Sequence, residues 1–172
     1  MIKIIGVLIV IFSGICLGFS KAAREQKKLE QGIDLKRMLY LLQSEIRYGF
    51  TPLPEAIASI ADKTSDEWKP FLVQVSTQLS SRTEESFSSV WSHALQTHLK
   101  GVILEPKFLK DLYSMGETLG YLDKEMQEKT IGFAIEQLEE QIFQMKDGVI
   151  KNCKMYRSLG LSFSLLLIIL LI

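Results

Sequence analysis

The sequence predicts an all-α protein, a compact bundle of about six helices with a hydrophobic membrane helix at each end of the chain. Apolar residues recur at alternating spacings of four and three, the repeat of one face of an α-helix. No stretch alternates apolar and polar residues with the β-branched enrichment of a strand. Of the 172 residues, 47% are hydrophobic and 23% are charged, a composition that excludes a disordered tail.

The charges are segregated along the chain, although 20 basic and 20 acidic residues cancel overall. Residues 30–150 hold 19 acids and 12 bases, a net charge of −7, whereas residues 21–28 and 151–157 each carry a net charge of +3. Nucleic acid is therefore not expected as a partner, because its binding needs a basic surface over the folded part.

Both ends of the chain predict membrane segments. Residues 4–19 carry no charge and nearly cover a hydrocarbon core of about 30 Å, so residues 1–20 are predicted to be an anchor. A cleaved signal peptide is the alternative, but no clear small-residue cleavage site follows the apolar run. Residues 159–172 are also uncharged and span roughly 21 Å as a helix. Residues 158–172 are predicted to insert into the membrane, with a buried core helix as the alternative.

The two basic flanks predict the orientation of the chain. They lie on the inner sides of the apolar segments, so the positive-inside rule places residues 21–157 in the cytoplasm as one helical domain. Cys16 then lies in an apolar segment and Cys153 in a reducing compartment, and no structural disulfide is expected.

Local signals predict the first two helices of this domain. Asp34 is expected to cap the first helix and Gly49 to end it. Pro52 and Pro54 start the second, because proline is tolerated in a first turn where amide donors have no partner. Their apolar faces are formed by Leu35, Leu39, Leu42 and Ile46, and by Leu53, Ile57 and Ile60.

Three further helices follow from the same apolar repeat. The third carries Trp68, the fourth covers about residues 84–98, and a loop over residues 100–106 separates it from the fifth. Their apolar faces comprise Trp68, Leu72, Val75 and Leu79, then Phe87, Val90, Trp91, Ala94 and Leu95, then Phe108, Leu112, Met115 and Leu119.

The sixth helix is the longest, with Asp123 as its cap and no proline after it. An apolar seam runs through residues 131–149, formed by Ile131, Ile135, Leu138, Ile142, Met145 and Val149. Packing inside its own bundle is the favoured interpretation of this seam, and pairing with a second subunit in a homo-oligomer is the alternative.

The residues of catalytic and ligand-binding chemistry do not form a recognisable pattern. The two histidines, His93 and His98, are five residues apart on one helix, so their side chains should point roughly 140° apart rather than share a zinc ion. No phosphate-binding glycine motif and no nucleophile elbow is present. The sequence therefore predicts no enzyme, no cofactor and no metal site.

Two interhelical turns supply the candidate partner contacts. In the turn over residues 116–123, Gly120 is expected to take a left-handed conformation after the fifth helix, and Glu117 and Tyr121 are the residues that the turn needs least. In the turn over residues 48–55, Phe50 and Glu55 are the corresponding candidates. The structural residues of the two turns are Gly49, Pro52, Pro54, Gly120 and Asp123.

These turns also carry a resemblance to a known class of proteins. The first segment resembles the opening of the cytoplasmic domain of type II secretion and type IV pilus inner-membrane platform proteins, in the run Leu42-x-x-Glu45-Ile46-x-x-Gly49-x-x-x-Leu53-Pro54-Glu55-Ala56. The second resembles their Gly-Glu-x-Ser-Gly-x-Leu signature, in Gly116-Glu117-x-x-Gly120-x-Leu122. This chain has Leu119 where that class usually has serine, so the contacts of the signature do not carry over directly.

A stronger resemblance, over nearly the whole chain, is to the stage III sporulation AB family of endospore-forming bacteria. Its motifs are matched by residues 45–56 and by Lys154-Met155-Tyr156-Arg157-Ser158-Leu159-Gly160. The resemblance implies a structural platform component of the mother-cell-to-forespore channel, located in the mother-cell membrane around the forespore. It also implies a cytoplasmic secretion-type ATPase, the stage III sporulation AA protein, and other membrane proteins of the same operon as partners.

Two other functions stay open from the residues themselves. One is a membrane-tethered adaptor that dimerises through residues 131–149. The other is a membrane-associated enzyme with its site between bundle and bilayer, for which a histidine close to Glu117 would be the first sign.

Overall fold

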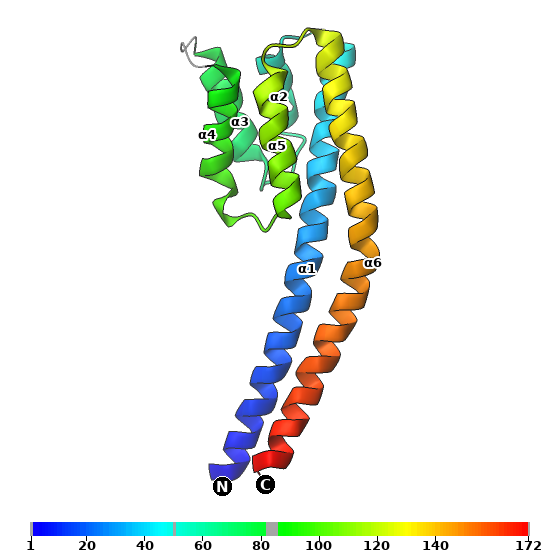
Figure 1. The fold of residues 1–172 in the computed structure, drawn as a ribbon. Helices are drawn as coiled ribbons and strands as arrows, with labels where there is room; N and C mark the ends of the chain where they lie inside the picture. The colour runs from blue at the N-terminus through cyan, green and yellow to red at the C-terminus, as the bar shows by residue number, and fades with distance from the viewer. Residues whose placement is uncertain (1, 50, 82–85, 172) are drawn as a thin grey trace. The chain divides into compact units, whose positions relative to one another are not determined.

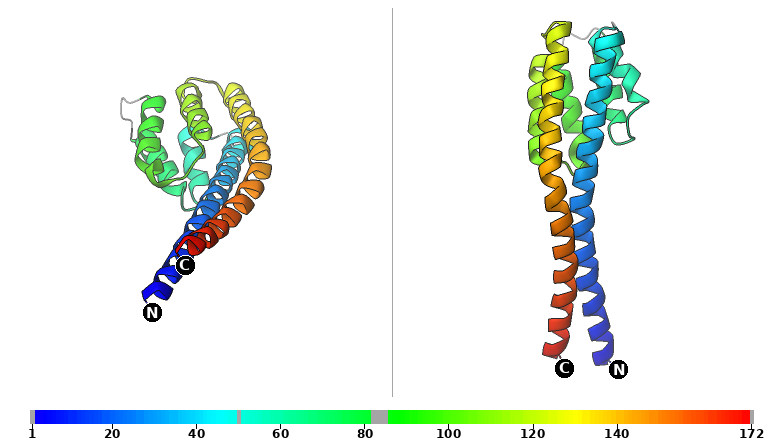
Figure 2. Two further views of the ribbon diagram at one scale, coloured as in Figure 1. Left: turned by 60° about the horizontal axis from the view of Figure 1, so that its bottom comes forward. Right: turned by 90° about the vertical axis from the view of Figure 1, so that its right-hand side faces the viewer.

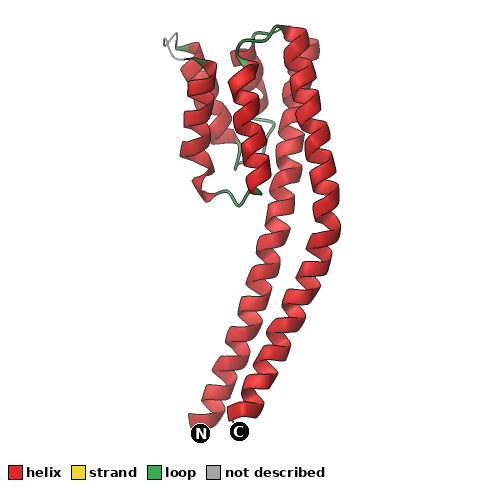
Figure 3. Ribbon diagram, in the orientation of Figure 1, coloured by secondary structure: helices red, strands yellow, loops and turns green. Residues whose placement is uncertain are grey.

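The part of the chain described in the computed structural model, residues 2–49, 51–81 and 86–171, consists of helices joined by short turns, without a strand. Few side chains are described before Gly18 or after Gly160. This confirms the predicted all-α fold (Figures 1 and 3). The helices are α1 (Ile2–Gly49), α2 (Leu53–Ala61), α3 (Lys69–Ser80), α4 (Phe87–His98), the 3₁₀ helix η1 (Leu99–Gly101), α5 (Pro106–Leu119) and α6 (Lys124–Leu171).

The chain divides into two compact units. The helix-pair unit comprises Met1–Glu30 and Phe143–Ile172, where α1 and α6 run antiparallel (Figure 2). The bundle unit comprises Gln31–Ile142 and contains α2 to α5 together with the remaining parts of α1 and α6.

Several predicted helix ends are confirmed. Pro52 precedes α2 and Pro54 lies in its first turn. Asp123 caps α6 as predicted, by accepting a 2.8 Å hydrogen bond from the Met126 amide, and Ser86, which the sequence did not predict as a cap, caps α4 by accepting one from the Ser89 amide. These oxygens satisfy amide donors that have no partner within the helix.

Three predicted boundaries are corrected. Asp34 does not cap a helix, because α1 continues through it from the apolar N-terminal stretch. Trp68 precedes the first turn of α3 instead of lying inside that helix, although its side chain is fully buried. Helix α4 begins at Phe87, and residues 84 and 85 of the predicted start lie outside the described residues.

An aromatic cluster forms the centre of the bundle unit. Trp68, Phe71 and Trp91 are completely buried. The Phe71 and Trp91 rings meet edge to face with centroids 4.8 Å apart, and Phe87 stacks on Trp91 at 5.5 Å. The Trp91 indole donates a 2.9 Å hydrogen bond to the backbone carbonyl of Leu112. This bond gives the buried indole N–H its partner and joins α4 to α5.

Helix α6 packs on α1 within the bundle unit. Its apolar seam is buried in the chain itself at Ile131, Ile135, Leu138 and Ile142. Polar contacts border the seam: Lys36 lies 3.0 Å from Glu139, and Arg47 lies 3.3 Å from Glu128. The intramolecular interpretation of this part of the seam is favoured, because a second subunit would have to displace contacts that already exist.

Among the described residues, no helix is long and apolar enough to cross a membrane. Residues 2–20 and 158–171 are helical, but most of their side chains lie outside those that the structure describes. The two membrane segments, 1–20 and 158–172, therefore stay predictions from the sequence.

A charge placed in the α6 seam should unfold the bundle unit. Ile135 is 3% exposed, so Ile135→Glu leaves an uncompensated carboxylate in an apolar interface and should cost more than about 3 kcal/mol. Chemical denaturation followed by tryptophan fluorescence measures this, because both tryptophans are buried in the bundle unit.

The exposed neighbour Glu136 provides the control, and Glu136→Lys should leave the denaturation midpoint nearly unchanged. A dimer that dissociates into folded monomers on Ile135→Glu would contradict intramolecular packing and support the dimerisation adaptor.

Candidate interaction surface

The two turns that supply the predicted contact residues lie at the same end of the bundle unit (Figures 1 and 2). Helix α1 ends at Gly49 where α6 begins, and the ion pair between Arg47 and Glu128 joins the two helices there. The turn between α5 and α6, residues 120–123, lies at this end as well. Five of the exposed residues of this end, Tyr48, Glu55, Glu117, Tyr121 and Met126, are called the turn-end surface below.

Two glycines fix how α5 reaches this surface. A Cβ atom at Gly116 would lie 2.6 Å from Cγ of Trp91, and one at Gly120 would lie 2.9 Å from Cγ of Phe87. Real Cβ atoms do not approach other heavy atoms so closely, so both positions require the absence of a side chain. The four-residue spacing puts both glycines on the face of α5 that meets α4.

Gly120 corrects the sequence prediction. Its φ is −71° and its ψ is −18°, a right-handed conformation that any residue can adopt. The glycine is needed for its contact with Phe87 and not for a left-handed turn. Gly120 still ends α5, as predicted.

Glu117 and Tyr121 are exposed on the other side of the same segment. Tyr121 is 76% exposed, the largest value among the exposed large hydrophobic side chains that the structure describes. Glu117 is exposed too. An exposed tyrosine offers an apolar ring and a hydroxyl group to a partner at low conformational cost. The structure therefore leaves both residues accessible, as a partner contact requires.

The turn between α1 and α2 contributes a second group to the surface. Glu55 is exposed in the first turn of α2, and Phe50 lies outside the described residues. The sequence interpretation missed Tyr48, which is 70% exposed and has the Arg47 guanidinium 5.4 Å from its ring centre. The sequence could have identified Tyr48, because this residue lies outside the apolar face that was correctly assigned to the first helix.

A groove between α5 and α6 extends from this end along the bundle unit. Its volume is about 280 Å³, and Phe133, 61% exposed, forms part of its wall. The sequence interpretation also missed Phe133 and Met126, which lie seven residues apart and outside the buried seam. The other residues of the groove are Asp111, Ser114, Met115, Thr118, Thr130, Ala134 and Gln137.

An ion pair holds the α1 end of this region in place. The Lys63 ammonium donates a 2.7 Å hydrogen bond to Glu45 Oε1, which joins α1 to the turn after α2. This hydrogen bond lowers the pKa of Glu45 from its ordinary 4.5. Hydrogen bonds from Lys69 and Lys36 likewise lower the pKa of Asp62 and of Glu139.

The histidines lie apart from the turn-end residues, and their side chains converge on one amide, which the five-residue spacing did not predict. Both contact one amide: His98 Nε2 lies 2.6 Å from Gln74 Oε1, and His93 Nδ1 lies 3.2 Å from Gln74 Nε2. The prediction that their side chains point apart failed because Gln74 on α3 reaches both rings with different atoms. Within the described residues, no group of three or more His, Cys, Asp or Glu side chains could hold a metal ion.

The fold defines the chain as a helical-bundle protein, with both predicted contact turns exposed at one end of the bundle. The chain belongs to the stage III sporulation protein AB family, whose sequence model matches residues 3–172. It is 31% identical over 171 residues to the stage III sporulation protein AB of Bacillus subtilis (strain 168), covering 99% of both chains. A solved structure of stage III sporulation protein AB (SpoIIIAB) is similar at a TM-score of 0.64 and 27% identity, covering 72% of this chain and 97% of that one.

The close approach of α5 to α4 predicts a stability effect at Gly116. Gly116→Ala should destabilise the protein by about 1–3 kcal/mol, because the added methyl group forces the Trp91 ring to move. Thermal unfolding of the full chain in detergent, followed by circular dichroism, measures the effect.

Gly148 is the matched control, since a Cβ atom there meets nothing within 4 Å. Gly148→Ala should be neutral or stabilising by up to about 1 kcal/mol, because alanine favours a helix. Equal midpoints for the two variants would show that Gly116 is not a packing constraint.

The lowered carboxylate pKa values predict a loss of stability in acid. A carboxylate with a depressed folded-state pKa stabilises the protein above its unfolded pKa, and this contribution disappears as the pH falls through the folded pKa. Removing the donor with Lys63→Gln should therefore weaken the pH dependence as the pH falls below the ordinary glutamate pKa of 4.5. The urea midpoint measured across this range checks the prediction.

Lys107→Gln, at another exposed lysine, serves as the control and should keep the wild-type pH dependence. If Lys63→Gln also keeps the wild-type pH dependence, the ion pair of Glu45 does not contribute to the loss of stability in acid.

Proposed function

We propose that this chain is a structural platform component of the sporulation channel in the mother-cell membrane around the forespore. In this role it docks a cytoplasmic secretion-type ATPase, of the stage III sporulation AA type, through the turn-end surface. The observation that carries the proposal is membership of a sporulation family, combined with the exposure of Glu55, Glu117 and Tyr121 on one end of a close-packed bundle.

Several features of the bundle unit support a docking role. Glu117 and Tyr121 belong to a segment whose opposite face is fixed by Gly116 and Gly120 against the aromatic cluster. A contact residue on a rigid element needs little ordering when a partner binds, so less of the interaction free energy is lost.

The membrane location rests on the sequence at both ends of the chain. The uncharged residues 4–19 and 159–172, each with a basic flank on its inner side, favour attachment to the bilayer with residues 21–157 in the cytoplasm. An ATPase in the cytoplasm then meets the acidic bundle unit on the same side of the membrane.

Substitutions on the turn-end surface should separate docking from folding. Glu117→Lys and Tyr121→Ala each change an exposed side chain, so the protein should stay folded and bound to membranes. Capture of the ATPase should fall by about tenfold or more, as for an exposed aromatic or charged contact at the centre of an interface. Co-purification from sporulating membranes, with the ATPase quantified, is the measurement.

Glu136→Lys is the control, because it makes the same charge reversal at an exposed position of α6 outside the turn-end surface. Unchanged capture by both Glu117→Lys and Tyr121→Ala would contradict docking through α5. Glu55→Lys then tests whether the turn between α1 and α2 makes the contact instead.

A further inference from the structure

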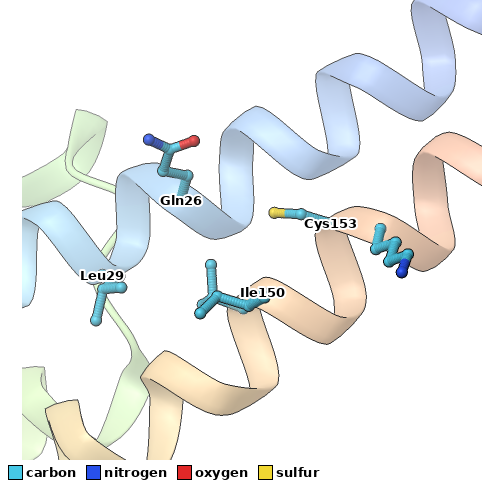
Figure 4. Close-up of a pocket in the computed structure, with 6 residues that line it drawn as sticks. Gln26, Leu29, Ile150 and Cys153 are labelled. Atoms are coloured by element: carbon cyan, nitrogen blue, oxygen red, sulfur yellow. The ribbon is translucent and has the colours of Figure 1, made fainter.

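The helix-pair unit contains a pocket of about 490 Å³ between α1 and α6 that none of the features above uses (Figure 4). Gln26 and Leu29 line it from α1, three residues apart and so on one helix face. Figure 4 shows Cys153 on α6 with its thiol directed towards α1, where it donates a 3.3 Å hydrogen bond to the Ala22 carbonyl. The residues that line the pocket from α6 are Val149, Ile150, Cys153 and Lys154.

The apolar wall of the pocket continues along α6 on the protein surface. Leu29, Val149 and Ile150 supply aliphatic side chains to the pocket, and Ile150 is 71% exposed. Phe143 is 72% exposed and precedes Ile150 by seven residues, or two helical turns, so both lie on one face of α6. We call Phe143 and Ile150 the apolar stripe of α6. Exposed apolar side chains that line up beside a pocket are typical of a protein contact.

The lipid of the bilayer is too far away to cover this stripe. Leu29 follows the apolar run 4–19 by ten residues, or about 15 Å of helix, and Ile150 precedes the run 159–172 by nine, or about 14 Å. The polar headgroup layer extends only roughly 5–8 Å beyond the hydrocarbon core. The pocket and the stripe therefore lie in water beyond the headgroups, where a protein is the partner that can bury them.

The charge of the helix-pair unit disfavours a second copy of the chain as that partner. Residues 21–30 have a net charge of +2, and residues 143–157 have a net charge of +3. Two copies that met through this face would bring like charges together, which opposes association. An acidic protein would be attracted instead.

Two lysines flank the apolar stripe of α6. Lys146 and Lys154 are exposed and lie four residues before and after Ile150, so all three are on one face of α6. Asp147 is the only acid of residues 143–157, so this face stays basic. Lys154 also lines the pocket, and its aliphatic stem can follow the apolar wall while its ammonium group reaches a carboxylate at the rim.

We propose that the pocket and the apolar stripe of α6 bind an acidic amphipathic helix of another protein, with apolar side chains of that helix against Phe143 and Ile150. Its carboxylates face Lys146 and Lys154. A helix is the matching partner because apolar residues seven apart complement the same repeat on a helix laid beside them. The proposal rests on the membrane location proposed above and adds a docking surface made of residues outside the turn-end surface.

Binding of synthetic peptides tests this surface, with the full chain in phosphatidylcholine nanodiscs and empty nanodiscs as the blank. Two labelled helical peptides of about 20 residues share one leucine stripe, which is flanked by glutamate in one peptide and by lysine in the other. Fluorescence anisotropy should show that the wild-type chain binds the glutamate peptide about tenfold more tightly. Lys154→Gln should weaken this peptide by about threefold, and Ile150→Ser by about fivefold because part of the apolar contact is lost.

Lys107→Gln and Val73→Ser are the matched controls, an exposed lysine and an exposed apolar residue of the bundle unit, and each should change the affinity by less than about twofold. Equal binding of the two peptides by the wild-type chain would overturn the proposal, as would equal losses in Lys107→Gln and Lys154→Gln. Absence of saturable binding of the glutamate peptide would overturn it too. Wild-type dimers that dissociate on Ile150→Ser would also overturn it and assign the face to a second copy.

Membrane retention is read separately, by washing sporulating membranes at alkaline pH. Wild-type chain that washes off contradicts the membrane location itself. Wild-type chain that stays in the membrane without preferring the glutamate peptide contradicts the acidic-helix site alone.

Discussion

The approach of α5 to α4 at Gly116 and Gly120 is the constraint on which the bundle unit depends. Two aromatic rings of α4, Phe87 and Trp91, pack against these glycines, and the Trp91 indole donates its N–H to a backbone carbonyl of α5. A close-packed interior has no room for added atoms, so the absence of two side chains determines where the rest of α5 lies. This contact therefore also determines where the exposed Glu117 and Tyr121 lie.

The two units use the same long helices for different chemistry. In the bundle unit, α1 and α6 enclose a buried aliphatic seam with polar contacts along its edge, such as Lys36 with Glu139. In the helix-pair unit, the same two helices carry exposed apolar side chains and cations beside a pocket. The first pattern is that of a self-contained fold, whereas the second leaves apolar side chains on the surface.

The apolar repeat was sufficient to predict the helical fold, because residues three or four positions apart lie on the same face of a helix and are buried together. It identified the buried faces of α5 and α6 almost residue by residue, including Phe108, Leu112 and Ile135. Local end signals were less reliable. Asp34 has the right chemistry for a cap and follows Gly32 closely, yet α1 continues through both residues. Whether a cap is used depends on the tertiary structure as well as on the residue.

The errors at the candidate site have the same origin. Gly120 was assigned to a left-handed turn because that is the usual local reason for a glycine after a helix, but its contact with Phe87 is a long-range one. The contacts of His93 and His98 with Gln74 depend on a third side chain from another helix, which spacing along α4 does not reveal. Exposure of Glu117 and Tyr121 was predictable, because the turn could be built without them.

Site-specific photo-crosslinking in sporulating cells tests the central claim most directly, with a photoreactive amino acid at position 121 or, for comparison, at Ala58. Ala58 is exposed on α2 and lies beside a shallow pocket formed with residues of α3. The account predicts that the secretion-type ATPase is crosslinked from position 121 and not from position 58. Crosslinking of the ATPase from position 58, with none from position 121, would contradict docking through Glu117 and Tyr121.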